Sequence, residues 1–597
     1  MCGIVGYVGE RNAQSILLDG LKRLEYRGYD SSGIAIAEAD GCISVRKRAG
    51  RIARLEELLS ESPLTGVCGI GHTRWATHGE PTDANAHPHT DESGGIAVVH
   101  NGIIENHQAL RETLRKRGVR FSSETDTEAV AHLLRLHDRG DMVRTLREVT
   151  ALLRGHFTLA VITADEPGKI FCVRRGSPLV IGRGRGENAL ASDLPALLPL
   201  TREVCFPEEG QIAVLTKDEV RLFDARSAPR APVFHPVAWE ADAAERGGHA
   251  HFMRKEIMEQ PSCFARMEEW YRDRSLLPSP PCAADIVACG TARHAGLTGA
   301  HFFKHLAGVP VRVFAASEYR YDPPLPVPGT LTLAVSQSGE TADTIAALEA
   351  AKAHGETAVL TNTPGSTLTR TAESAFFTLA GPEIGVASTK AFTTQLLALL
   401  LLAMDAGRQN GFLPEHRFRN LKAALRELPE QAETVLRSAD ALTAFAAQKT
   451  LSPVCFFIGR GIDHPIALEG ALKLKEVACQ PCEAYPAGEL KHGPIALVRK
   501  GTPVIALCSQ GETLEKTLMN LKETKARGAE TLCVCPERLE SRARMDADAV
   551  FTVPDAPLPL LPLLMSLPLQ WIAYQAAVSR GLDPDKPQNL AKSVTVE

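Results

Sequence analysis

The sequence has no excess of positive charge and no unbroken apolar run long enough to cross a bilayer. Its 66 lysines and arginines against 71 aspartates and glutamates give a net charge of −5, which leaves no general positive field for nucleic acid or anionic lipid. The most apolar stretches are residues 396–404, too few to span a membrane, and residues 557–577, which Pro559, Pro562 and Pro568 interrupt. We therefore expect no nucleic-acid or membrane partner, and we expect both stretches to form buried helices.

The sequence also lacks a disulfide framework and a complete metal site. The 14 cysteines are scattered, and no charged-then-apolar leader opens the sequence, a combination that favours a reducing cytoplasm. Zinc needs about four ligands, and each candidate group supplies only a pair. These groups are Cys479/Cys482, His87/His89 and His249/His251. We therefore expect a cytoplasmic protein without a metal or an organic cofactor.

Length and composition predict several globular domains. Apolar residues make up 44% and charged residues 23% of 597, which is ordinary globular composition in a chain too long for one hydrophobic core. In residues 2–217, strand-like apolar runs alternate with polar loops, and helical periodicity is found at 13–24 and 127–136. This pattern predicts a layered α+β domain of helices on predominantly antiparallel sheets. Residues 218–260 have no sustained apolar period, and we interpret them as the domain end and a linker.

Residues 261–415 and 430–582 show a different pattern, in which buried strands run into Gly, Ser or Thr turns and then into helices. Such alternation predicts parallel sheets. The first strand of each block ends in a glycine, Gly290 or Gly459, so the two blocks form a weak internal repeat. We predict two α/β doubly wound domains, followed by a polar tail over residues 583–597.

Cys2 is a candidate N-terminal nucleophile. Removal of Met1 would place its thiol beside a free α-amino group, whose pKa is about 8 and which can act as the general base. Attack of the thiolate on a carboxamide then releases ammonia and leaves a thioester for water. The alternative for this residue taken alone is a buried core cysteine behind a retained Met1.

Three later segments supply partners for the charges of such a reaction. Arg74 offers a guanidinium, which binds a carboxylate such as that of glutamine through two hydrogen bonds. Asn101 and Gly102 offer a side-chain amide and a backbone N–H as oxyanion donors. Asp126 offers a carboxylate for the substrate ammonium group. Together these segments favour the nucleophile over the core cysteine.

The first domain resembles the class II glutamine amidotransferases. The resemblance rests on Cys2-Gly-Ile-Val-Gly, Glu25-Tyr-Arg-Gly-Tyr-Asp-Ser, the Arg74 segment and His100-Asn-Gly-Ile-Ile-Glu-Asn, and it covers the entire domain. It implies an N-terminal-nucleophile (Ntn) fold, with Cys2 as the nucleophile and Asn101 and Gly102 as the oxyanion hole. The implied glutamine-binding residues are Arg74, Trp75, Thr77, His78, His87 and Asp126.

Residues 336–341, Ser-Gln-Ser-Gly-Glu-Thr, form a candidate phosphate-binding turn. They lie between a strand-like run and a helical pattern, so hydroxyls, backbone N–H groups and the positive helix end converge on one point. The alternative is a turn that only caps the helix. Thr291 at a similar turn and the segment 385–390 favour a phosphate.

The last third of the chain carries candidate acid and base groups. Helical spacing places Glu469, Lys473 and Glu476 on one face. Opening a ketose ring needs an acid or base such as His492, and a carboxylate such as Glu476 suits proton transfer between C1 and C2. Lys592 can form a Schiff base with a keto sugar. The alternatives are a solvated Glu/Lys salt bridge and a solvated C-terminal lysine.

These segments resemble the tandem sugar-isomerase (SIS) domains of the glutamine:fructose-6-phosphate amidotransferase family, and the match runs from end to end. It implies conversion of L-glutamine and D-fructose 6-phosphate to L-glutamate and D-glucosamine 6-phosphate, ammonia transfer inside the protein, a tail that closes over the sugar, and a homodimer. The implied sugar-phosphate residues are Thr291, Ser336, Gln337, Ser338, Thr341, Val386, Ser388, Lys473 and Ala591. The implied isomerisation residues are Glu476, His492 and Lys592.

The sequence departs from that family at one turn and leaves two other functions open. The family commonly reads Cys-Gly-Thr-Ser-Tyr where this chain has Cys289-Gly-Thr-Ala292-Arg293, so a hydroxyl contact to the sugar is absent at Ala292. The first alternative function is a deglycase of another sugar-phosphate amine with a silent first domain. The second is a sugar-phosphate sensor, which would keep the phosphate turn without acid and base groups.

Overall fold

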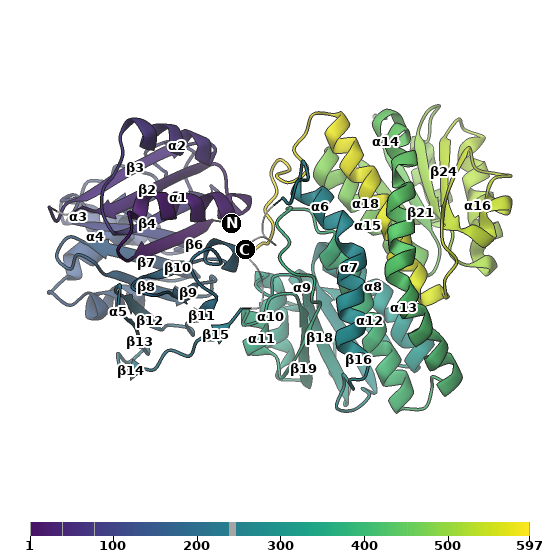
Figure 1. Ribbon diagram of the computed structural model, residues 1–597, viewed down its shortest axis with the longest axis horizontal. Coiled ribbons are helices and arrows are strands. Elements are labelled where there is room, and N and C mark those ends of the chain that lie inside the picture. Colours follow the sequence, from purple (N-terminus) through teal and green to yellow (C-terminus); the bar gives the residue numbers. More distant parts are fainter. Residues whose placement is uncertain (1, 39, 77, 238–245, 450–451, 596–597) are drawn as a thin grey trace. The chain divides into compact units, whose positions relative to one another are not determined.

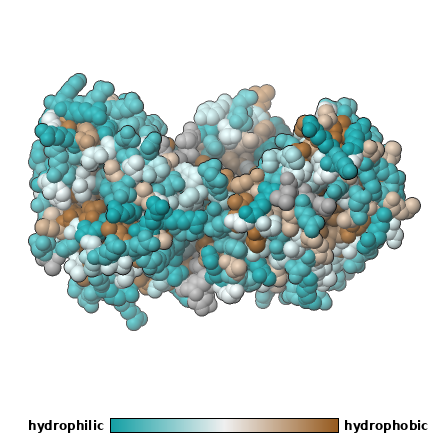
Figure 2. All heavy atoms as spheres, turned by 90° about the horizontal axis from the view of Figure 1, so that it is seen from above, coloured by the Kyte–Doolittle hydropathy of each residue, from teal (hydrophilic) through white to brown (hydrophobic). Residues whose placement is uncertain are grey.

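The computed structural model describes residues 2–38, 40–76, 78–237, 246–449 and 452–595. The chain divides into two compact units, residues 1–244 with 591–597, and residues 245–590. Figure 1 labels the helices and strands of each unit. Figure 2 shows that hydrophilic residues cover most of the visible surface, with apolar residues scattered among them.

Two antiparallel sheets form the first unit. Among the described residues, one sheet has the strand order β15-β11-β9-β10-β1-β4-β2-β3 and the other β14-β13-β12-β8-β7-β6-β5. The strands of the first sheet are β1 (Gly3–Val8), β2 (Ser31–Ala37), β3 (Ile43–Ala49), β4 (Cys68–Arg74), β9 (Val180–Arg183), β10 (Asn188–Ala191), β11 (Glu203–Cys205) and β15 (His235–Pro236). Those of the second are β5 (His89–Thr90), β6 (Ile96–Gly102), β7 (Phe157–Thr163), β8 (Ile170–Arg175), β12 (Ile212–Leu215), β13 (Val220–Phe223) and β14 (Pro229–Arg230).

The core of the first unit lies in layers. One apolar cluster takes Ile4 and Ile70 from the first sheet and Val99 and Ile162 from the second, so the two sheets pack face to face. The helices lie on the outer faces, as Figure 1 shows. They are α1 (Ala13–Leu24), α2 (Ile52–Glu61), α3 (His107–Lys116), α4 (Thr127–His137) and α5 (Met142–Leu152). The predicted layered α+β fold is confirmed.

The helix α1 forms where the periodicity predicts it. Asn12 caps it, because its side chain accepts a hydrogen bond from the Gln14 N–H. Leu17 and Leu21 are buried on the face toward the first sheet. Gly20 allows close packing there, since a Cβ at this position would lie 2.9 Å from a Val5 methyl group.

Two parallel sheets of identical strand order form the second unit. They read β17-β16-β18-β19-β20 and β22-β21-β23-β24-β25, the order 2-1-3-4-5 in both copies, which confirms the predicted pair of doubly wound domains. Their strands are β16 (Ala283–Ala288), β17 (Val311–Ala315), β18 (Thr330–Ser336), β19 (Glu356–Thr361), β20 (Ser374–Phe377), β21 (Cys455–Gly459), β22 (Cys482–Pro486), β23 (Pro503–Leu507), β24 (Glu530–Pro536) and β25 (Ala549–Val553).

Helices join the two copies into one core. The longer helices of this unit are α6 (Phe252–Met258), α7 (Gln260–Tyr271), α8 (Gly290–Phe302), α10 (Ala342–Ala351), α12 (Lys390–Gln409), α13 (Glu415–Ser438), α14 (Thr443–Lys449), α15 (Asp463–Ala478), α16 (Gly511–Lys525) and α18 (Leu561–Ser579). A single apolar cluster includes Leu396 of α12, Leu474 of α15 and Ile572 of α18. By length and mean composition alone, helices α12 and α18 could cross a membrane, but 89% of each apolar window is buried in the protein. The prediction of buried helices is therefore confirmed.

Candidate active site

Cys2 lies just before β1, beside the end of β4. The two strands pair antiparallel with Gly3 opposite Thr73, so the residue that precedes β1 meets the residues that end β4. The Cys2 Sγ atom lies 3.3 Å from the backbone nitrogen of Trp75 and 3.6 Å from its carbonyl oxygen. Burial raises the pKa of the Cys2 thiol, and the Trp75 N–H and the charge of Arg74 offset only part of this effect. The thiol therefore needs a base to become a thiolate.

The end of β6 brings Asn101 and Gly102 to the same place. The Asn101 Nδ2 atom donates a hydrogen bond of 3.0 Å to the backbone carbonyl of Cys2. Gly102 has a φ of 124°, and a Cβ there would lie 2.1 Å from the carbonyl oxygen of His156, so the position requires glycine. The predicted oxyanion donor Asn101 is thus in contact with the predicted nucleophilic residue.

His72, on β4, fixes the orientation of the Asn101 amide. Its Nε2 atom lies 2.9 Å from the carbonyl oxygen of His100 and 3.1 Å from Asn101 Oδ1. A carbonyl oxygen only accepts, so Nε2 carries the proton and donates to both oxygens. Asn101 must then turn its oxygen to His72 and its NH₂ group to Cys2. His72 is fully buried, and burial lowers its pKa to about 3, so the ring remains neutral.

Replacing His72 with leucine is expected to slow glutamine hydrolysis with little change in the KM for glutamine. The released Asn101 amide no longer presents its N–H groups in a fixed direction, and loss of one oxyanion donor costs roughly 10²–10³ in kcat. In His72→Gln, the side-chain amide supplies an N–H close to the position of the His72 Nε2–H group. This variant is expected to restore most of kcat. Steady-state glutaminase kinetics of the full chain give the result.

The matched control for that experiment is His132→Leu. His132 is also a buried histidine, but it lies on α4 near Glu128, 3.6 Å away, and it does not contact Asn101. We expect it to retain kcat. A kcat loss in His132→Leu equal to that in His72→Leu would contradict the orienting role.

Arg74 and Asp126 supply opposite charges near the thiol, and both act electrostatically on Cys2. They are buried, with 3% and 5% of their surfaces exposed. The Arg74 guanidinium donates to the carbonyl oxygens of residues 78–79, and Asp126 Oδ2 accepts from the Ile104 N–H at 2.9 Å. A buried cation and a buried carboxylate beside one thiol suit a substrate that carries both a carboxylate and an ammonium group.

The other predicted glutamine-binding residues belong to the same region of the chain. His87 is buried and stacks on His72, with 4.1 Å between the ring centroids. Trp75 and His78 lie half-buried in the loop after β4. Thr77 lies outside the described residues.

Four neighbouring buried histidines predict that the first unit loses stability in acid. Burial lowers the pKa of His72, His87, His89 and His100, so these rings are neutral in the folded chain, whereas histidine in an unfolded chain titrates near about 6.5. Below that pH the unfolded chain binds more protons, and each such histidine lowers the free energy of unfolding by ~1.4 kcal/mol per pH unit. We expect strands β4 and β6 to lose hydrogen-exchange protection between about pH 7 and pH 5.

The variant His72→Gln provides the control for this pH dependence. It removes one titrating group, so its stability should fall less steeply with pH than that of the wild type. A wild-type first unit whose protection does not change over this range would contradict the neutral histidine cluster.

In the second unit, two turns lie at the carboxyl ends of neighbouring parallel strands. Thr291 follows β16 and Ser336 ends β18, and these strands pair with Ala288 opposite Val335. The strand order reverses at β16, between β17 and β18. Ligands of doubly wound sheets bind at this switch point, so the fold brings Thr291 and the turn 336–341 to one edge, as the sequence predicts.

Hydroxyl groups close the turn 336–341. Ser336 Oγ lies 2.9 Å from Thr341 Oγ1 and accepts from the Gly339 N–H at 3.1 Å. The acid of the turn, Glu340, is engaged elsewhere, because its carboxylate accepts from the N–H and hydroxyl of Thr367 at 2.8 and 2.7 Å. The turn therefore presents hydroxyls and amides, which suit a phosphate. Its remaining predicted residues, Gln337 and Ser338, are half-buried.

Glu469, Lys473 and Glu476 share one face of α15, as their spacing predicts. The Lys473 ammonium forms an ion pair with Glu476 and lies 3.4 Å from Glu469 Oε1. Only 1% of Lys473 is exposed. Burial alone would lower its pKa, but the carboxylates of Glu476 and Glu469 outweigh burial and raise it. The alternative of a solvated surface salt bridge is wrong for this group.

Residues of the first SIS copy hold Glu469 of the second. The Thr291 hydroxyl donates to Glu469 Oε1 at 3.1 Å, and His294 Nδ1 lies 2.8 Å from Glu469 Oε2. Thr291 and His294 are one helical turn apart on α8, so both reach α15. Sequence reasoning missed His294, although its spacing from Thr291 was a usable signal.

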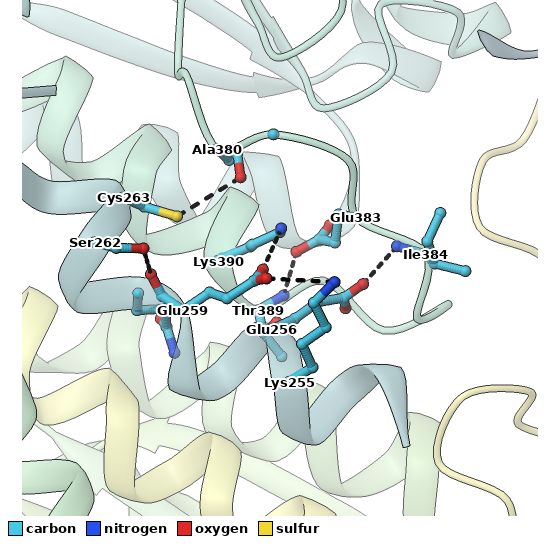
Figure 3. Close-up of polar contacts among 12 residues, drawn as sticks. Lys255, Glu256, Glu259, Ser262, Cys263, Ala380, Glu383, Ile384, Thr389 and Lys390 are labelled. Atoms are coloured by element: carbon cyan, nitrogen blue, oxygen red, sulfur yellow. Dashed lines mark hydrogen bonds and ion pairs between the residues drawn. The ribbon is translucent and has the colours of Figure 1, made fainter. Parts of the chain in front are cut away.

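Val386 and Ser388 lie in the irregular segment 380–389, between β20 and α12. Figure 3 shows this segment above Glu256 of α6 and above Glu259, which lies between α6 and α7. The Ser388 hydroxyl donates to Glu383 Oε2 at 3.3 Å. Sequence reasoning missed Glu256 and Glu383, whose contacts become visible only in three dimensions.

The structure does not bring every predicted sugar residue together. His492 ends a short 3₁₀ helix, is exposed, and forms no hydrogen bond or ion pair with Glu476 among the described residues. Ala591 and Lys592 are half-buried and belong to the C-terminal residues grouped with the first unit. Ala292 follows Thr291 at the start of α8.

Sequence comparisons cover both units. The glutamine amidotransferase domain family matches residues 72–199, and the SIS domain family matches residues 283–405 and 453–580. A protein of Symbiobacterium thermophilum named glutamine–fructose-6-phosphate aminotransferase (isomerizing) is 50% identical over 611 residues, with 100% of both chains covered. A protein of the same name from Thermus thermophilus is 48% identical over 608 residues, again with 100% of both chains covered.

A solved structure resembles the second half of the chain. It is the C-terminal domain of glucosamine-fructose-6-phosphate aminotransferase from Francisella tularensis, with a TM-score of 0.54 and 35% identity, and the match covers 57% of this chain and 100% of that one. Both the fold and the full-length identities agree with the resemblance that the motifs indicate. This chain therefore belongs to the family of isomerizing glutamine–fructose-6-phosphate aminotransferases.

Proposed function

We propose that this chain transfers the amide nitrogen of L-glutamine to D-fructose 6-phosphate and isomerises the product to D-glucosamine 6-phosphate, with release of L-glutamate. The observation that carries the proposal is the ion pair of the buried Lys473 with Glu476 on α15. Thr291 and His294 of the copy that bears the turn 336–341 bind Glu469 of the same helix. A sugar-phosphate sensor needs the turn but does not need an acid and a base on the helix bound to that copy.

In the glutamine half, Arg74 and Asp126 bind the α-carboxylate and α-ammonium groups of glutamine. The Cys2 thiolate attacks the side-chain amide, and its proton passes through the α-amino group to the leaving ammonia. The developing oxyanion accepts hydrogen bonds from Asn101 Nδ2 and the Gly102 N–H. Water then attacks the thioester, which releases glutamate and restores the thiol.

In the sugar half, Ser336, Ser338 and Thr341 hold the phosphate. His492 assists ring opening, and Lys592 activates the open-chain ketone as a Schiff base. Ammonia adds at C2 and displaces the Lys592 amine, which leaves the ketose imine. The water lost when the Schiff base formed balances the water used to hydrolyse the thioester.

Isomerisation then needs one proton transfer between carbon atoms. Glu476 takes a proton from C1 and returns it to C2, while the O1 hydroxyl proton passes to the imine nitrogen, which converts the ketose imine to the 2-amino aldose. Lys473 stabilises the negative charge that develops between these carbons. The lysine keeps its charge because two carboxylates raise its pKa.

We further propose a homodimer in the cytoplasm that uses no metal. The dimer is supported by the exposed position of His492, which finds no partner within the described part of a single chain. Light scattering of the purified full chain tests this proposal, and a mass equal to one chain of 64.4 kDa would contradict it.

Incubation of purified protein with glutamine and fructose 6-phosphate tests the reaction. We expect glutamate and glucosamine 6-phosphate in equal amounts. Glutamate without an amino sugar would contradict the synthase. Sugar-phosphate binding with neither product would indicate the sensor, and consumption of an added sugar-phosphate amine without glutaminase activity would indicate the deglycase.

A further inference from the structure

The segment 380–389 carries two proposed sugar contacts but has no regular structure of its own. Val386 and Ala387 are buried, with 8% and 2% of their surfaces exposed. Buried backbone N–H groups need acceptors, and here no neighbouring strand or helical turn supplies them. The acceptors come instead from Glu383 within the segment and from Glu256 and Asp585, which are distant in sequence.

Glu256, on α6, is the acceptor for the middle of this segment. Its Oε1 atom accepts from the N–H groups of Ile384 at 2.5 Å and Gly385 at 3.1 Å, and Figure 3 shows the carboxylate directed at the segment. Glu256 is 1% exposed. The fit is close, because a Cβ at Gly385 would lie 2.9 Å from Glu256 Oε2.

Two other acidic residues hold the flanks of the segment. Glu383 Oε1 accepts from the Thr389 N–H at 2.9 Å, and the backbone carbonyl of Asp585 accepts from the Val386 N–H at 3.1 Å. The Asp585 carboxylate also accepts from the N–H groups of Phe252 and Met253, each at 2.8 Å. Helix α6 is therefore held at its start by Asp585 and in turn holds the segment through Glu256.

Glu256 and its neighbour Glu259 have different hydrogen-bond partners. Lys390 is 2% exposed and donates to Glu259 Oε2 at 2.7 Å, and Lys255 lies 3.5 Å from Glu259 Oε1. Glu259 thus forms ion pairs with Lys390 and Lys255, as Figure 3 shows. Glu256 accepts hydrogen bonds from the backbone of the segment and also acts electrostatically on Lys390. The two carboxylates therefore differ in their hydrogen-bond partners.

We propose that Glu256 is a positioning residue for the sugar phosphate. By fixing the backbone at Ile384 and Gly385, it sets the place of Val386 and Ser388 against the sugar. This inference rests on the proposed function, in which those two residues contact the substrate. It predicts an effect on sugar binding that is absent from glutamine hydrolysis.

The test is steady-state kinetics of the full-length enzyme with saturating glutamine and varied fructose 6-phosphate. Glu256→Ala is expected to raise the KM for the sugar at least about 10-fold with less than about 3-fold change in kcat, because it removes binding rather than chemistry. Glu256→Gln keeps the Oε1 acceptor and is expected to stay within about 3-fold of the wild-type KM. Glutamine hydrolysis without sugar should be equal in all three proteins.

Two further variants complete the design. Glu259→Ala removes a carboxylate from the same cluster without releasing the segment, and we expect a wild-type KM. Gly385→Ala displaces the segment without removing a charge, so it should raise the KM for the sugar as Glu256→Ala does. It replaces Glu256→Ala in the test if Glu256→Ala does not fold.

The outcomes distinguish this inference from the proposed function. If wild-type enzyme forms no glucosamine 6-phosphate, the proposed function fails. If wild-type enzyme is active and folded Glu256→Ala retains the wild-type KM, the positioning role is overturned. An equal rise in KM for Glu259→Ala also overturns it, because the charge of the cluster and not the backbone contact would then control sugar binding.

Discussion

Replacing Cys2 with alanine is expected to abolish glutamine-driven synthesis of glucosamine 6-phosphate, by roughly 10⁴-fold or more. The thiol forms the bond to the substrate carbonyl, and no other described cysteine lies beside Asn101 and the Trp75 backbone. Ammonium at high concentration should still support amino sugar formation, since the sugar half keeps its own residues. Coupled assays of both nitrogen sources measure the two rates.

Cys172→Ala is the matched control for the nucleophile. Cys172 lies on β8 in the same unit and is fully buried, so this change tests the loss of a thiol away from the site. It should retain glutamine-driven activity. Glutamine-driven activity in Cys2→Ala would contradict the nucleophile, and intact mass of the active wild type should show that Met1 is removed.

Replacing Glu476 with glutamine is expected to reduce amino sugar formation by roughly 10²–10⁴-fold, the range for loss of a positioned general base. Glu476 is the more exposed of the two carboxylates on Lys473, with 21% of its side chain accessible against 4% for Glu469. It can therefore reach a substrate carbon, and an amide in its place cannot take the proton from C1. Glutamine hydrolysis should continue in this variant.

The control for this prediction is Glu483→Gln. Glu483 lies on β22 of the same SIS copy and is exposed, where the Tyr485 hydroxyl donates to it. The change removes a carboxylate without touching α15, so both activities should stay near wild type. Equal synthesis rates in Glu476→Gln and wild type would exclude Glu476 as the base.

Local patterns predicted the elements and turns of this chain well. The period at 13–24 corresponds to α1, and the strand-turn-helix pattern at Ser336 corresponds to β18 and α10. Such features depend on neighbouring residues, whose side chains follow the helix or strand period. The shared face of Glu469, Lys473 and Glu476 followed from helical spacing for the same reason.

Contacts between distant segments could not be predicted in this way. His72 reaches Asn101 only because β4 and β6 come from two sheets that pack face to face, and Glu256 meets Ile384 across 128 residues of sequence. A single sequence contains no direct signal for such pairs. The burial of Lys473 was also hidden, because its helix α15 packs against α8 from one half of the unit and α18 from the other.

Because Thr291 and His294 of the first SIS copy bind Glu469 of the second, the proposed sugar site depends on both copies. The first copy contributes the turn 336–341, and the second contributes Lys473 with Glu469 and Glu476. Neither copy alone therefore has all the groups that the proposed reaction needs. Duplication followed by such specialisation means that a substitution in one half is selected in the context of the other. A fragment spanning only residues 261–415 would contain the phosphate-binding turn but no carboxylate to transfer the proton. An ancestor with a single domain would have needed to dimerise to bring both sets of groups together.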